Sequence, residues 1–110
     1  MTRWVPIRYR DFWDVPRIFL TNYENKLFLF DCPFDDEVED YPRHYKVYVL
    51  PDLAEEVLAG SWAELSTLAT QYLGEVPIEK VRFDATKRRE IDTAVIGELT
   101  EKLTPAADPL

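Results

Sequence analysis

The sequence is poor in glycine and cysteine and has no long apolar run. It holds 3 glycines and a single cysteine, Cys32. One cysteine cannot form an internal disulfide, and with one histidine it cannot supply the several soft ligands of a zinc site. The glycines form no phosphate-cradling loop, and no apolar run approaches the ~20 residues of a membrane helix. We therefore expect no cofactor and no membrane association.

The N-terminal segment also lacks the apolar core of a signal peptide, so we expect a cytoplasmic protein. The 110 residues are 46% hydrophobic and 31% charged, a balance typical of a globular chain. This length suits one hydrophobic core. We expect a single α+β domain over residues 1–103 and a disordered C-terminal tail over residues 104–110.

The net charge of −8 is concentrated in the middle of the chain. Residues 1–30 have a balance of +2, residues 31–64 of −8, and residues 65–110 of −2. A negative field repels phosphate backbones, which argues against direct binding of nucleic acid. A protein partner with a basic surface is the natural complement.

The first half of the chain has the pattern of strands. Pro6 cannot donate a ladder hydrogen bond, so its strand is expected at a sheet edge. Asn25 tolerates the positive φ of a tight turn and predicts a hairpin. The runs Ile18–Leu20 and Leu27–Phe30 are continuously apolar, which is typical of strands covered on both faces. The expected strands are residues 4–10, 17–23, 26–31 and 45–50.

The second half has the pattern of helices. Ser61 and Glu64 have the spacing of a capping box, an apolar stripe follows, and Gly74 stands where a helix C-cap would. Asp92 or Thr93 can cap a last helix that buries Val95, Ile96, Leu99 and Leu103. The other expected elements are helices over 51–58 and 61–73 and a second short hairpin with arms 76–83 and 88–91.

These elements predict an antiparallel sheet with one capped amphipathic helix packed on it, a second short hairpin and a C-terminal helix. An SH3-like curl of the N-terminal half is a further expectation at the level of the fold. It implies no function by itself.

The acidic segment is the first candidate site. It places Asp35, Asp36, Glu37, Glu39 and Asp40 in one inter-strand loop. Crowded carboxylates repel one another unless water, salt or a cation screens them. Three interpretations are open: a solvated loop, a docking surface for a basic protein, and a Ca²⁺ or Mg²⁺ site. The spacing matches no calcium loop, and the segment has no glycine for a chelating turn.

Aromatic residues beside this segment are the second candidate. Five of them lie among charged residues in or next to connections: Tyr9, Phe12, Trp13, Phe34 and Tyr41. One interpretation is that they plug the open end of the sheet. The other is an exposed aromatic and acidic surface suited to peptide or arginine recognition. Stacking of bases would need a basic groove beside the rings, and the neighbours here are acidic.

Residues for catalysis are few. Any Ser-His-Asp or Cys-His arrangement would have to use His44, the one histidine. Cys32 ends an apolar strand and is expected to be a small buried residue. Asp11, Asp14, Asp31 and His44 are the residues of an alternative function, a small hydrolase assisted by a divalent metal.

The leading hypothesis is a non-enzymatic binding or regulatory module that engages a basic protein partner. One form is an inhibitor that masks the basic site of a toxin or nuclease. The predicted partner surface is Asp35, Asp36, Glu37, Glu39, Asp40, Tyr41, Phe12 and Trp13. The basic cluster Lys87–Arg89 also permits self-association with the acidic surface of a second copy.

Overall fold

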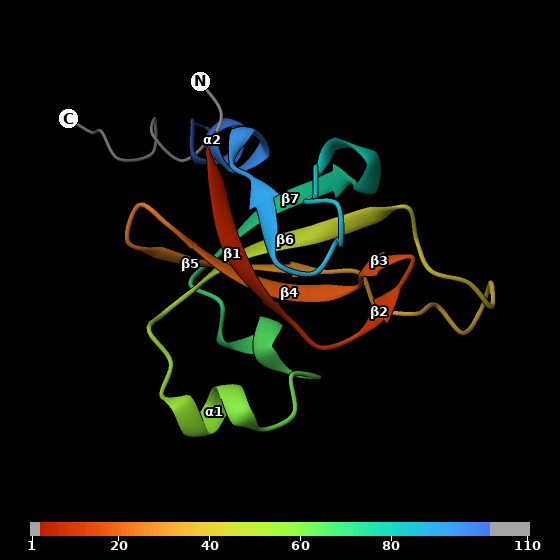
Figure 1. The fold of residues 1–110 in the computed structure, drawn as a ribbon. Helices are drawn as coiled ribbons and strands as arrows, with labels where there is room; N and C mark the ends of the chain where they lie inside the picture. The colour runs from red at the N-terminus through yellow and green to blue at the C-terminus, as the bar shows by residue number, and fades with distance from the viewer. Residues whose placement is uncertain (1–2, 102–110) are drawn as a thin grey trace.

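Six antiparallel strands form the central sheet of the computed structural model, which describes residues 3–101 (Figure 1). The sheet is open, and its order is β7-β6-β5-β4-β1-β8. A small second sheet consists of β2 and β3. The strands are β1 (Trp4–Tyr9), β2 (Phe12–Trp13), β3 (Val15–Pro16), β4 (Ile18–Tyr23), β5 (Lys26–Asp31), β6 (His44–Leu50), β7 (Gln71–Pro77) and β8 (Glu90–Asp92). The helices are α1 (Glu55–Ala59), α2 (Ala94–Glu101) and the 3-10 helices η1 (Leu65–Leu68) and η2 (Ile78–Lys80).

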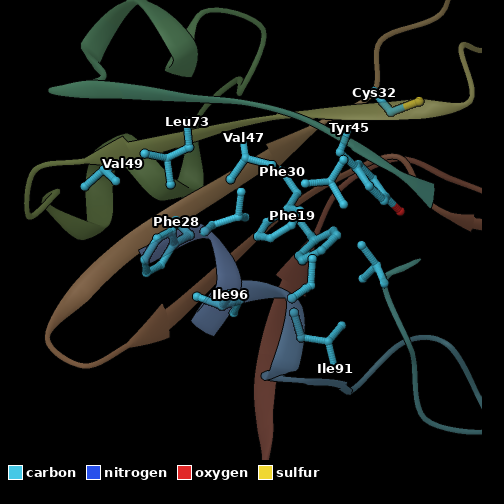
Figure 2. Packing of buried hydrophobic residues seen from close by; sticks show 14 of the residues in the cluster. Phe19, Phe28, Phe30, Cys32, Tyr45, Val47, Val49, Leu73, Ile91 and Ile96 are labelled. Atoms are coloured by element: carbon cyan, nitrogen blue, oxygen red, sulfur yellow. The ribbon is translucent and has the colours of Figure 1, made fainter. Parts of the chain in front are cut away.

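The central strands bury side chains on both faces of the sheet. Along β5, Phe28 and Phe30 belong to one core cluster and Leu29 belongs to the other. This alternation follows from the two-residue repeat of a strand, and it explains why the run is continuously apolar. In the larger cluster, shown in Figure 2, Phe19 stacks on Phe30 with 4.6 Å between centroids, and Tyr45 meets both rings edge-on.

Helix α2 covers the face that carries the larger cluster. The Asp92 carboxylate accepts a hydrogen bond from the backbone N–H of Ala94 at 2.8 Å, which satisfies an orphan donor at the helix start. Val95, Ile96 and Leu99 are buried against the sheet. These residues confirm the predicted C-terminal helix, and Leu103 lies outside the described residues.

The segment between β6 and β7 covers the opposite face, below the sheet in Figure 1. Trp62 and Leu65 pack there against Leu20, Leu29 and Leu50. Arg8 of β1 and Arg10, which follows β1, hold this layer against the sheet. Arg8 pairs with Glu55 at 2.9 Å, and the Arg10 guanidinium donates to the carbonyls of Leu58 and Gly60 while lying over the Trp62 ring.

The first hairpin has the predicted form. β4 and β5 pair from Ile18↔Asp31 to Tyr23↔Lys26. Glu24 and Asn25 have φ values of 51° and 67°, as a two-residue turn with positive φ at both central positions requires.

The predicted helix over 61–73 is wrong. Only η1 is helical there, and β7 begins at Gln71 and pairs with β6. The hydroxyls of Thr67 and Thr70 donate to the carbonyls of Glu64 and Val49. Ser and Thr compete for backbone groups in this way and weaken a helix. Pairing with the free side of β6 then outweighs the helical apolar pattern.

Two further expectations need correction. β1 is not an edge strand, because it pairs with β4 through Ile7–Tyr9 and with β8 through Trp4–Pro6. The arms of the second hairpin form an isolated bridge between Phe83 and Ile91 rather than a ladder, and β8 pairs with β1 along its other edge. The turn between the arms has the predicted place, and an SH3-like curl stays a prediction.

Gly74 lies in β7 with φ of +105°, next to a register shift between Val47 and Tyr48 of β6. Open space surrounds the position of an added Cβ, so a substitution there strains only the backbone. We expect Gly74→Ala to lower the free energy of unfolding by about 1–2 kcal/mol, measured by urea denaturation.

Gly97→Ala is the matched control. Gly97 also faces open space, but it lies inside α2 without positive φ. Alanine is the better helix former, so this change should raise stability by about 0.5–1 kcal/mol. Equal effects of the two substitutions would contradict the assignment of strain to Gly74.

Candidate functional site

The small hairpin β2–β3 projects from one end of the central sheet (Figure 1). Phe12 pairs with Pro16 and Trp13 with Val15, and Asp14 makes the turn with φ of 69°. Asp is among the residues that tolerate this left-handed conformation. The Trp13 side chain is 64% exposed at the hairpin tip.

The acidic loop, residues 32–43, lies at the same end of the sheet and connects β5 to β6. The backbones of Asp35 and Asp40 exchange hydrogen bonds of 2.9 and 3.3 Å, which closes a turn over 36–39. The Asp35 carboxylate accepts from the Glu37 N–H, and Glu39 has φ of 56°. The loop is therefore an ordered turn in which Asp35 is half-buried and the other four acidic residues are exposed.

Arg17 ties the hairpin to the acidic loop. Its Nε donates to the Trp13 carbonyl at 2.9 Å, and its guanidinium lies 4.4 Å from the centroid of the Tyr41 ring. Nη1 lies 3.6 Å from Sγ of Cys32, which donates to the Pro42 carbonyl. Only 9% of Arg17 is exposed.

Tyr45 supports the hairpin from beneath. Its hydroxyl donates to the Pro16 carbonyl at 2.6 Å, and burial raises the pKa of this phenol far above its usual value. Burial also raises the pKa of the Cys32 thiol, against the opposing influence of Arg17. Cys32 is fully buried, as predicted, and a thiol with a raised pKa is a poor nucleophile.

A pocket of about 340 Å³ opens between the hairpin and the acidic loop. Its wall contains aromatic and charged groups, so the two candidate sites from the sequence, the acidic segment and the aromatic residues beside it, both contribute to this pocket. The lining residues that matter here are Trp13, Asp14, Arg17, Asp40, Tyr41 and Glu79. We call this space the hairpin pocket.

The predicted partner surface is brought together only in part. Trp13, Asp40 and Tyr41 line the hairpin pocket. Phe12 does not, because its ring packs 5.9 Å from that of Tyr9 and lies under the Arg88 guanidinium at 4.5 Å. The remaining carboxylates belong to the outer turn of the acidic loop: Asp35, Asp36, Glu37 and Glu39.

The residues of the alternative hydrolase are dispersed. Asp31 and His44 line a pocket of about 290 Å³, Asp14 lines the hairpin pocket, and Asp11 lines a third pocket of about 430 Å³. Burial raises the pKa of Asp31, while Lys46 partly counteracts this shift. Across residues 3–101, the structure brings together no group of three His, Cys, Asp or Glu side chains suited to holding a metal ion.

Arg17 and Glu79 are site residues that the sequence did not identify. Arg17 stands between apolar residues, after Val15 and Pro16 and before Ile18. A charge inside such a run is a detectable signal of a buried cation. Glu79 follows β7 in η2 and reaches the pocket only through the sheet topology, so the sequence holds no local signal for it.

Searches against protein-family models, curated proteins and solved structures find no match to this chain. No helix within the described part of the chain is long and apolar enough to cross a membrane.

The turn after Phe83 holds Arg88 in place over Phe12. Its centre is the Asp84 carboxylate, which accepts hydrogen bonds from the Thr86 hydroxyl at 2.6 Å and from the backbone N–H groups of Arg88 and Arg89 at 3.2 Å. These donors, the Thr86 side chain first, lower the pKa of Asp84 to about 2 from an ordinary 3.8.

A lowered pKa in the folded state means that ionised Asp84 stabilises the fold. The contribution is complete above the unfolded pKa of 3.8 and disappears as the pH falls through about 2. We expect Asp84→Ala to lower the melting temperature at neutral pH, and the difference from the wild type should shrink below pH 4. Thermal melts across this range test it, with the exposed Asp52→Ala as control. A difference independent of pH would contradict it.

Proposed function

We propose that this protein is a non-enzymatic binding module that engages a basic protein partner with the end of the sheet formed by hairpin β2–β3 and the acidic loop. One observation carries the proposal. Trp13, an exposed tryptophan, lines the same pocket as Asp40 and Tyr41 of the acidic loop. Exposed aromatic side chains beside charged groups are typical of the residues that dominate protein interfaces.

The electrostatics of the acidic loop support a basic partner. Within residues 3–101 the two ion pairs are Arg8–Glu55 and Arg82–Asp92, so the loop carboxylates pair with no cation of the described chain. Solvent ions or a basic partner can therefore reduce the repulsion between these carboxylates. A basic surface gains attraction here both at long range and on contact.

The aromatic groups of the pocket add contact area for the same partner. Trp13 can accept an arginine or lysine over its ring face, and cation–π attraction grows where water is excluded. Phe34, 49% exposed, lies outside the lining of the pocket and packs edge-on against Tyr41, with 5.1 Å between centroids. A basic side chain entering the pocket would thus meet the Trp13 ring and carboxylates.

The first test concerns Trp13. A partner is captured from the native host, identified, and produced in pure form. We expect Trp13→Ala to weaken its binding by about 2 kcal/mol, roughly thirtyfold in Kd, measured by calorimetry. The control is Trp4→Ala, which removes an exposed tryptophan from β1. Equal loss in both variants would contradict the placement of the interface.

The second test concerns charge. We expect slower association with this partner when three loop charges are removed in the variant Asp36→Asn, Glu37→Gln, Asp40→Asn. The association rate constant of this variant should also depend less on salt concentration than that of the wild type. The matched control removes the same charge elsewhere with Glu56→Gln, Glu64→Gln and Glu98→Gln. Stopped-flow kinetics at several ionic strengths compare the three proteins. Equal slowing by both variants would indicate net charge rather than the acidic loop.

A further inference from the structure

Arg17 is a buried cation with no carboxylate partner among the residues that the structure describes. No carboxylate oxygen of the described residues lies within salt-bridge distance of its guanidinium. Its hydrogen bonds use Nε toward the Trp13 carbonyl and Nη1 toward Cys32 Sγ, and Nη2 has no partner in residues 3–101. Burial of an unpaired charge costs free energy. The guanidinium of Arg17 therefore has N–H donors that could gain from an anionic partner.

The unused donors remain accessible. Every fully buried side-chain nitrogen and oxygen in the described chain has a hydrogen-bond partner, so unpartnered Nη2 keeps some exposure. Arg17 lies between two pockets, the hairpin pocket and the 430 Å³ pocket that also contains Cys32. Its neighbours Trp13 and Tyr41 both line the hairpin pocket. The contact with the Tyr41 ring and the hydrogen bond from Nε hold the guanidinium in place. A fixed fork of N–H groups is the geometry that recognises a carboxylate through two parallel hydrogen bonds.

The pocket also limits what kind of anion can enter. Asp14, Asp40 and Glu79 line it together with Arg17 and Arg43. A doubly charged phosphate would be repelled more strongly by these carboxylates than a singly charged carboxylate. A cation carried beside the ligand's carboxylate would meet Asp14, Asp40 and Glu79. The favoured ligand therefore carries one negative and one positive group close together.

We infer that the hairpin pocket binds a carboxylate next to a cationic side chain, with the carboxylate on Arg17 and the cation among Asp14, Asp40 and Glu79. This inference rests on the proposed function, since it specifies how the partner presents its basic residue. Two parts of a partner carry the required chemistry. One is a C-terminal arginine or lysine with its own α-carboxylate, and the other is an internal acidic residue beside a basic one.

The experiment uses four small probes with the whole wild-type protein. They are N-acetyl-arginine, N-acetyl-arginine amide, N-acetyl-norleucine and N-acetyl-aspartyl-arginine amide. Binding is followed by NMR titration of the Trp13 indole signal. N-acetyl-arginine should bind at least about tenfold more tightly than its amide, because only the acid can pair with Arg17. The aspartyl probe shows whether a side-chain carboxylate serves as well as a C-terminal one.

The variant Arg17→Lys keeps the charge but removes the planar fork, so it should abolish most of the difference between acid and amide. The acid–amide comparison in the wild type needs no variant, which keeps the test valid if Arg17→Lys is poorly folded. Persistence of the difference in a folded Arg17→Lys protein would overturn the role of Arg17.

The other outcomes separate this inference from the proposed function. Equal binding of N-acetyl-arginine and its amide would overturn the carboxylate role of Arg17 and leave recognition of a basic partner standing. Equal binding of N-acetyl-norleucine and N-acetyl-arginine would overturn the cation position and would count against the proposed function as well. Failure of all four probes to bind would overturn the inference, while the partner measurements would still test the proposed function.

Discussion

Burial of the central strands on both faces is the constraint on which the rest of the structure depends. β4 and β5 place aromatic residues toward α2 and leucines toward the segment between β6 and β7. A sheet of this kind needs two covering layers, and the short chain supplies both with little helix. These layers do not cover the end of the sheet that carries hairpin β2–β3 and the acidic loop. These two connections therefore pack against each other there, around Arg17.

The site takes its rigidity from this core. Tyr45 belongs to the aromatic stack with Phe19 and Phe30, and its hydroxyl holds the carbonyl of Pro16 at the base of the hairpin. Arg17, the next residue, binds the Trp13 carbonyl and contacts the Tyr41 ring. The hairpin backbone that carries Trp13 is therefore held by side chains that are themselves buried. A backbone held in this way loses little conformational entropy on binding.

Local signals predicted part of this arrangement and missed the part that depends on topology. Asn25 and the apolar runs beside it indicated the hairpin β4–β5, and Asp92 indicated the start of α2. The apolar stripe after Ser61 predicted a helix, but Gln71–Pro77 pairs as a strand with the free edge of β6. Hydrophobic periodicity describes one segment at a time, so it cannot predict pairing between distant segments. Trp13 and Tyr41 were identified as surface candidates from their charged neighbours. Their meeting across Arg17 depends on how the sheet is arranged. Phe12 differs from Trp13 because its ring packs against Tyr9 and lies under Arg88.

The irregularity at Gly74 also affects whether copies of the protein can associate through their sheet edges. β7 is an edge strand, and an edge strand offers free backbone groups to any passing chain. The positive φ of Gly74 and the terminal Pro77, which has no N–H, interrupt a regular ladder, and the charge of Glu75 disfavours the approach of another strand. At the far edge, β8 is only three residues long. Both edges are thus poor templates for strand addition, a protection against aggregation that leaves the hairpin end free to carry exposed aromatic side chains.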